Sequence, residues 1–149
     1  MTTLLLAALL GVAPAQQTPG QRVAARALSG EFGKLAPWQR DGYTRLLRQP
    51  EARTLVLTAY WPAEGRQSQV DCRGRKLTRG AMASNRLPQG TFVYIPSWGR
   101  SFRVVDRGSR SNDRRAGSRG TWCDVWVSRS RDARGRCDWT ATAAEVARP

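Results

Sequence analysis

The chain has 149 residues, about the length of one domain, and a formal net charge of +14. It contains no histidine, which excludes Ser-His-Asp and Cys-His catalysis and histidine-ligated zinc. Its three cysteines are one short of an all-cysteine zinc site. An enzyme of this composition has to work with carboxylates, hydroxyls, guanidinium groups and backbone, so we expect neither a metal nor a cofactor.

All the basic residues except Lys34 and Lys76 are arginines. The planar guanidinium group pairs well with carboxylate and phosphate groups and stays charged at any physiological pH. The charge therefore predicts an anionic partner, such as nucleic acid, an acidic glycan or a membrane surface. The alternative is that the arginines only form a solvated surface.

The first fifteen residues, MTTLLLAALLGVAPA, form an apolar run that ends in Ala13-Pro14-Ala15. This pattern predicts a secretory signal peptide over 1–15, and hence a protein that is secreted or held in the periplasm or cell envelope. A buried N-terminal helix is the alternative. A membrane span is disfavoured because about 20 apolar residues are needed and this run is shorter, so we expect none in the mature chain.

Residues 16–50 are expected to form an N-terminal extension. Gln16 to Gly33 is poor in aromatic residues and predicts a flexible lead-in. Ala36 to Gln49 predicts a short helix that begins at Pro37, is weakened by Gly42 and is ended by Pro50.

After residue 50 the chain turns to short β-branched and aromatic runs bounded by Gly, Pro and Ser, which are typical of strands. The predicted strands are Arg53–Trp61, Thr91–Pro96, Ser101–Asp106 and Trp122–Val127. Ser97–Arg100 predicts a hairpin turn, with Gly99 available for a positive φ. The closing WTATAAEV fits strand or helix, and its threonines favour strand. Residues 51–149 thus predict an all-β domain, a small barrel in preference to a sandwich.

Four segments in order carry a resemblance to a known family. They are LTAYWP (Leu57–Pro62), GRKLTRGAMASNRLPQGT (Gly74–Thr91), VYIPSWGRSFRVVDRG (Val93–Gly108) and CDVWV (Cys123–Val127). Together they resemble the three-aspartate (3D) domain and the related rare-lipoprotein-A-like proteins. Over about Leu55 to Val146, the resemblance implies a six-stranded double-psi β-barrel, here preceded by a short N-terminal helix.

The family pattern has three acids, and this chain matches two of them. Asp106 and Asp124 correspond to the second and third. The first would fall at Asn85 or has no counterpart, and Cys123 stands where the pattern has Ile or Val.

Family members that are enzymes cleave peptidoglycan glycan strands as lytic transglycosylases, so the resemblance implies this reaction and this partner. Asp124 is the candidate acid. Alternation along a strand puts Asp124 on one face with Trp122 and Trp126. Partial desolvation between the two tryptophans would raise the pKa of Asp124, and nearby arginines would lower it. The alternative for Asp124 is an arginine-paired aspartate that holds a loop. Asp106 either supports catalysis or caps a turn.

The segment between the two acids reads as a loop rich in Gly, Ser and Arg. Within it we expect Arg107, Arg114 and Arg115 to bind the lactyl carboxylates of muramic residues through bidentate contacts. Asp113 is expected to be merely solvated. Tyr60 and Trp98 either stack on sugar rings or pack in the core. We expect the protein to be a monomer.

In an exported chain three cysteines suggest one disulfide and one remaining thiol. A Cys123–Cys137 bond would close a loop of roughly 15 residues across the turn-rich Ser128–Arg136, worth ~3 kcal/mol. Pairing of Cys72 with either of the others is the alternative.

Two other classes of function compete with the enzyme. One is a non-catalytic polysaccharide-binding module of the cell wall, of the expansin-like type, on the same barrel. The other is nucleic-acid binding, favoured by the basic composition. The signal peptide and the lack of a helix-turn-helix, zinc-finger or RNA-recognition signature argue against it, so no nucleic acid is expected.

Overall fold

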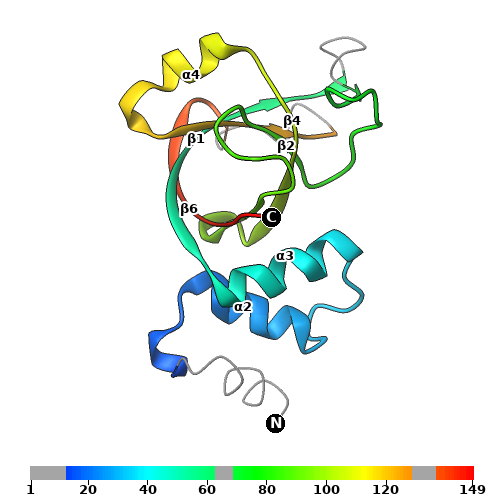
Figure 1. Cartoon of the computed structure of the whole chain (residues 1–149), viewed down its shortest axis with the longest axis vertical. Coiled ribbons are helices and arrows are strands. Elements are labelled where there is room, and N and C mark those ends of the chain that lie inside the picture. Colours follow the sequence, from blue (N-terminus) through cyan, green and yellow to red (C-terminus); the bar gives the residue numbers. More distant parts are fainter. Residues whose placement is uncertain (1–12, 63–68, 129–136) are drawn as a thin grey trace.

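The computed structural model describes residues 13–62, 69–128 and 137–149. Within these ranges six strands close into a barrel in the order β1-β5-β2-β4-β3-β6 (Figure 1). The strands are β1 (Glu51–Tyr60), β2 (Ala81–Ala83), β3 (Phe92–Ile95), β4 (Arg100–Asp106), β5 (Thr121–Trp126) and β6 (Thr140–Ala147). The predicted small β-barrel is confirmed, and the closing segment is a strand. The sequence pattern missed β2, because three residues are too few to show alternation.

Two pairs of neighbouring strands in the barrel run parallel, β1 with β5 and β2 with β4. The other four pairings are antiparallel. The predicted hairpin between β3 and β4 is confirmed. Its turn contains the short 3₁₀ helix η4 (Pro96–Trp98), and Gly99 follows in the left-handed region with φ 59°.

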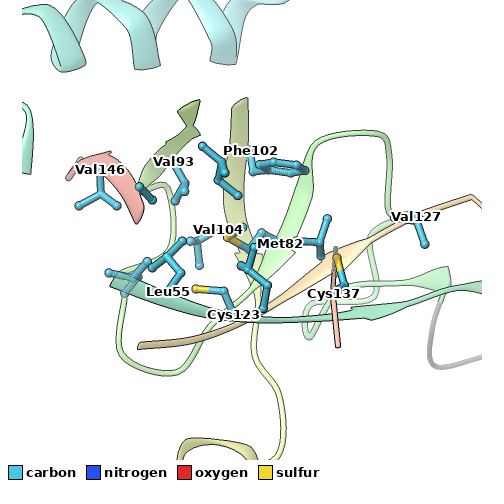
Figure 2. Packing of buried hydrophobic residues seen from close by; sticks show 14 residues of the cluster. Leu55, Met82, Val93, Phe102, Val104, Cys123, Val127, Cys137 and Val146 are labelled. Atoms are coloured by element: carbon cyan, nitrogen blue, oxygen red, sulfur yellow. The ribbon is translucent and has the colours of Figure 1, made fainter. Parts of the chain in front are cut away.

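The barrel interior is filled by every second residue of the strands, as strand geometry requires. Leu55 and Leu57 of β1, Phe102 and Val104 of β4, and Cys123 of β5 all belong to this buried cluster (Figure 2). Since successive side chains alternate faces, the intervening residues of the same strands lie on the outside, where the helices and the candidate site are.

Helices cover the outer face of the barrel. Figure 1 shows α2 (Pro19–Leu28) and α3 (Pro37–Arg48) together on one side of the barrel and α4 (Arg110–Ala116) on the other. The helix predicted from Pro37 is confirmed. The flexible lead-in predicted for 16–33 is wrong, because Pro19–Leu28 is a helix that buries three alanines, Ala24, Ala25 and Ala27.

Helix α2 is held by a buried acid of β6. Glu145 accepts a hydrogen bond from the backbone N–H of Gly20 at 2.8 Å and another from the Thr18 hydroxyl. Thr18 is also the N-cap of α2 and forms a capping box with Gln21. A carboxylate at a helix N-terminus is favourable because it meets unpaired N–H groups and the positive end of the helix dipole.

Helix α3 packs against β3 through its glycine. A Cβ atom on Gly42 would lie 1.9 Å from Cδ2 of Phe92, which is fully buried. Tyr43 packs edge-on against the same ring, with centroids 4.9 Å apart. Gly42 therefore sets the distance between α3 and the barrel, which explains a residue that otherwise weakens the helix.

Residues 1–12, which make up most of the predicted signal peptide, lie outside the described residues. None of the helices in the described ranges has the length and apolar character to cross a bilayer.

Replacement of Gly42 by alanine is expected to destabilise the protein, although alanine normally strengthens a helix by up to about 1 kcal/mol. The added methyl group collides with Phe92, and such overpacking costs about 1–3 kcal/mol. Urea denaturation measures the difference. The matched control is Arg40→Ala, an exposed position of the same helix, with a change within about 0.5 kcal/mol. A Gly42→Ala protein at least as stable as the parent would contradict this packing.

Removal of the Glu145 side chain is expected to release α2 from the barrel. In Glu145→Ala the Gly20 N–H and the Thr18 hydroxyl lose their acceptor, which costs about 1–3 kcal/mol. Native-state hydrogen exchange should then show loss of protection at Ala24 and Ala25, while Leu55 stays protected. Glu145→Gln, which keeps one acceptor oxygen, should lose less. Unchanged protection in α2 of the alanine variant would show that another contact holds the helix.

Candidate functional site

Two acids of the predicted site lie in one row across four neighbouring strands. The register places Asp106 of β4 beside Ala83 of β2, Ala83 beside Asp124 of β5, and Asp124 beside Thr58 of β1. With strands about 4.8 Å apart, the backbones of the two aspartates are separated by roughly 10 Å. The structure thus brings together the two acids that match the family pattern.

An irregularity in strand pairing puts Asp106 in this row. Met82 pairs with Val104, but Ala83 pairs with Asp106, so Val105 is an extra residue in β4. Regular alternation would turn Asp106 inward with Phe102 and Val104, which belong to the barrel interior. A bulge re-aims the side chains that follow it, and here it gives Asp106 the outer face.

Asp124 is half-buried and is held by a chain of hydrogen bonds. Its Oδ1 accepts a hydrogen bond from the Thr58 hydroxyl at 2.7 Å, and Thr58 Oγ1 accepts one from Nε1–H of Trp122 at 2.9 Å. Trp122 is fully buried. The predicted faces of β5 are confirmed, because Cys123 and Val125 belong to the interior cluster and Trp122 to an outer one. The sequence analysis missed Thr58, although it lies two residues before Tyr60 on the same face.

Asp106 is buried and its carboxylate is largely occupied by the protein. Oδ1 accepts hydrogen bonds from the backbone N–H groups of Cys72 at 2.7 Å and Arg107 at 2.8 Å. The Tyr60 hydroxyl donates to Oδ2 at 3.4 Å. These contacts are those of an aspartate that caps a turn, one of the two roles predicted for it.

Tyr60 lies near both acids. Burial raises the pKa of Tyr60, and the negative charges of Asp106 and Asp124 raise that pKa further. A tyrosine whose pKa is raised keeps its proton, so its hydroxyl is a donor at every physiological pH. Tyr60 also packs against an outer cluster that contains Val56 and Trp122, so core packing is part of its role.

The loop that reaches Asp106 through Cys72 is organised by another aspartate. Asp71 accepts hydrogen bonds from the N–H groups of Arg73 and Arg75, and the Arg75 guanidinium lies 2.7 Å from its Oδ2. Burial alone would raise the pKa of Asp71, but the hydrogen bonds from Arg75 and Arg73 outweigh it and hold that pKa below its ordinary value. The shape of the loop is therefore held by contacts of its own, independently of its hydrogen bond to Asp106.

The segment between the two acids is a helix followed by a short 3₁₀ turn, where a loop was predicted. Helix α4 begins after Ser109, whose hydroxyl accepts a hydrogen bond from the Ser111 N–H at 3.3 Å, and ends at Gly117 with φ 56°. Ala116 anchors it in the outer cluster with Trp122. The sequence held these signals, a serine N-cap and a glycine eight residues later.

The three arginines predicted to bind substrate differ in their surroundings. Arg107 donates from Nη1 to the carbonyl oxygens of Ser84 and, at 2.8 Å, Leu87. The guanidinium of Arg115 stacks over the ring of Trp139, 4.0 Å from its centroid. Arg114 is exposed and makes no hydrogen bond or ion pair through its side chain within the described part of the chain. Of the three, Arg114 is thus the one whose guanidinium is available to a ligand.

Asp113, expected to be solvated, has a side chain only 14% exposed. Its Oδ2 accepts a hydrogen bond from Nδ2 of Asn85 at 2.8 Å, and Asn85 Oδ1 accepts one from the Gly108 N–H at 3.1 Å. The expectation was wrong because α4 folds back toward the loop after β2. Asn85 thus connects Asp113 to the turn after Asp106.

Trp98 is the last residue of the short 3₁₀ helix between β3 and β4. Its ring packs edge-on against Phe102 with centroids 5.8 Å apart, and it lines a groove together with Trp126. The sequence had left open whether Trp98 stacks on sugars or packs in the core, and the structure gives it both a core contact and a groove wall.

The predicted Cys123–Cys137 disulfide is not formed. Both residues belong to the buried interior cluster and carry free thiols, and Figure 2 shows their sulfurs apart. Most of the connecting segment, 129–136, lies outside the described residues. Burial raises the pKa of the Cys123 thiol to about 12, so it stays protonated. Cys72 is exposed, and Nε2 of Gln89 lies 3.1 Å from its sulfur.

Across the described ranges, no three Cys, Asp or Glu side chains are grouped so as to hold a metal ion. Comparisons with protein-family models, with curated proteins and with solved structures find no match to this chain. The likeness to the three-aspartate and rare-lipoprotein-A-like proteins therefore stays a prediction from the four segments.

The hydroxyl of Thr58 is expected to be needed for the stability of this site. Thr58→Val keeps the shape of the side chain but leaves Nε1–H of Trp122 without its acceptor and removes a donor from Asp124, at a cost of about 1–3 kcal/mol. Thr58→Ser keeps the hydroxyl and should cost less than about 1 kcal/mol. Urea denaturation compares the two variants. Equal stability of the valine and serine proteins would show that the hydrogen-bond chain contributes nothing.

Proposed function

We propose that this chain is an exported cell-wall protein that cleaves peptidoglycan glycan strands as a lytic transglycosylase. The observation that carries the proposal is the position of Asp124, half-buried on the outer face of the barrel, hydrogen-bonded to Thr58 and two strands from Asp106. The two parallel strand pairs of the closed barrel support its assignment as a double-psi barrel of the family that the four segments resemble.

The reaction needs one carboxyl group that first gives and then takes a proton. Protonated Asp124 donates its proton to the glycosidic oxygen while the bond from the muramic C1 to that oxygen breaks. The 6-hydroxyl of the same muramic residue attacks C1 and gives its proton to the Asp124 carboxylate. An anhydro ring forms, the leaving sugar carries the first proton, and Asp124 is protonated again. Neither water nor histidine takes part.

The remaining residues of the row have supporting roles in this proposal. Thr58 orients the Asp124 carboxylate through the 2.7 Å hydrogen bond. Asp106 holds the loop at Cys72 and the hydroxyl of Tyr60, so it maintains the shape of the surface beside the acid. Arg114 is placed on α4, where its guanidinium is available to a lactyl carboxylate of the substrate.

One observation favours a non-catalytic wall-binding module as the second candidate. Asp106 is buried, and both its oxygens accept hydrogen bonds from the protein, which is typical of a structural acid. On this account Asp124 is structural too, and the barrel binds glycan without cutting it.

Glycan cleavage is expected to depend on Asp124. The purified chain is incubated with glycan strands, both peptide-bearing and stripped, and the products are analysed by mass for anhydro-muramic ends. Asp124→Asn cannot supply a proton, so the rate should fall at least about a hundredfold, with the cooperative melting transition retained. Asp41→Asn, an exposed aspartate of α3, should leave the rate unchanged.

Three results would count against the proposal. Parental turnover by the Asp124→Asn protein would remove Asp124 from the reaction. Ordinary reducing ends would mean hydrolysis. Binding of glycan by the parent chain without any product would favour the wall-binding module.

A further inference from the structure

A groove of about 640 Å³ lies between α3, the β3–β4 hairpin and the end of β5, where Phe102, Val125 and Val127 of the interior cluster reach its wall. Three tryptophans from three different elements line it. They are Trp38, Trp98 and Trp126. Trp126 lies two residues after Asp124 on the same face of β5, about 7 Å along the strand. The groove therefore reaches the strand that carries the proposed acid, and its lining includes no Asp or Glu.

A smaller hollow of about 180 Å³ continues the groove. The two share the wall made by Trp38, Arg79 and Gly80. The hollow is lined further by Arg75, Lys76 and Arg103 and contains one acid, Asp71, whose carboxylate is paired with Arg75 at 2.7 Å. We call the two together the α3 groove.

The α3 groove carries an excess of positive charge. Lys76, Arg79, Arg100 and Arg103 make no ion pair within the described ranges of the chain. Four guanidinium or ammonium groups with one already paired carboxylate favour an anionic ligand, and the arginines among them suit carboxylates through bidentate contacts.

Two of the three tryptophans of the α3 groove are fixed by their neighbours. The ring of Trp98 packs edge-on against Phe102, and the ring of Trp38 is tilted against Phe92 with centroids 6.1 Å apart. Gly80 has φ 91°, and a Cβ atom there would lie 2.8 Å from the Trp38 ring, so the chain needs glycine at this wall. Rigid aromatic side chains bind with little loss of entropy.

We propose that the α3 groove binds a saccharide chain that carries carboxylates. The identity of that chain as the peptidoglycan glycan strand rests on the proposed function, with the bound units lying to one side of the bond at Asp124. Sugar rings pack their C–H faces on the tryptophans, and the carboxylates pair with Arg79 and Arg100.

The polar groups of the groove favour a glycan over single-stranded nucleic acid. Gln39, Tyr43 and Ser101 also line the groove. The Tyr43 hydroxyl donates to the Ser101 hydroxyl at 3.4 Å and Gln39 Oε1 accepts from the Ala36 N–H, so the Gln39 amide N–H groups and the Ser101 hydroxyl proton are the donors left for sugar hydroxyls. A single strand of nucleic acid instead needs a run of open stacking surfaces beside a phosphate track. Helix α3 forms one wall of the groove through Trp38 and Gln39. The close packing of Gly42 on Phe92 holds the helix in that position.

The test is calorimetric binding of peptide-stripped glycan strands at low ionic strength, with Asp124→Asn as the parent so that nothing is cleaved. Arg79 and Arg100 are exposed and their side chains hold no other described residue, so the double variant Arg79→Gln, Arg100→Gln should keep its melting temperature. We expect its Kd to rise about tenfold. Arg22→Gln with Arg48→Gln removes the same charge from exposed positions outside the groove lining and should change Kd less than about twofold.

A second ligand isolates the carboxylate contact. The same glycan with its lactyl carboxylates reduced to alcohols should bind the parent about tenfold more weakly, and the groove variant should show no further loss. If carboxylate reduction weakens glycan binding equally in the parent and in the groove variant, Arg79 and Arg100 do not contact the carboxylates.

Other outcomes overturn the inference directly. They are an unchanged Kd in the groove variant, no glycan binding by the parent, or tighter binding of single-stranded oligothymidine that the groove variant abolishes. Failure of the groove is distinguishable from failure of the proposed reaction. If the native chain cleaves glycan but the groove variant binds glycan as well as its parent, only the groove proposal fails. If the groove variant binds tenfold more weakly but the native chain cleaves nothing, only the proposed reaction fails.

Discussion

The extra residue that β4 carries opposite the step from Met82 to Ala83 determines where the acids of this barrel lie. In a β4 strand paired regularly with β2, Asp106 would face the apolar interior like Phe102 and Val104, where an unpaired carboxylate is very costly. With Val105 accommodated as a bulge, Asp106 shares the outer face with Ala83, Asp124 and Thr58. Its carboxylate then accepts hydrogen bonds from the N–H of Cys72 and from the Tyr60 hydroxyl. The bulge thus couples the loop after β1, the end of β4 and the middle of β5 into one surface.

The helices give that surface its surroundings. Helix α4 covers the outer cluster around Trp122 on one side and carries the exposed Arg114. On the other side, α2 and α3 are fixed by Glu145 and by the contact between Gly42 and Phe92. Those two contacts place Trp38 in the wall of the α3 groove, whose far wall includes Trp126. The acid row and the groove therefore meet at the strand that carries Asp124.

Strands, interior side chains and the α3 helix were predictable because alternation and proline positions are local signals. Cys123 and Val125 face inward as their spacing indicated, and Asp124 faces outward. Three features were not predictable, because they depend on contacts distant in sequence. The bulge that turns Asp106 outward arises in the pairing with β2. Asp113 is held by Asn85, 28 residues before it, and α2 is held by an acid 125 residues after Gly20. Helix α4 had a serine cap and a terminal glycine, but its arginines made it read as a loop.

A chain without histidine limits the chemistry of this surface to carboxyl, hydroxyl and guanidinium groups. A single carboxyl group that shuttles a proton while the substrate supplies its own nucleophile fits that limit, and it predicts that water stays out of the products. The most direct measurement is therefore cleavage of glycan strands in water labelled with the heavy oxygen isotope, followed by mass spectrometry of the new ends. The account predicts anhydro-muramic ends that carry no label. Labelled reducing ends would contradict it, because water would then have attacked the sugar in place of the 6-hydroxyl.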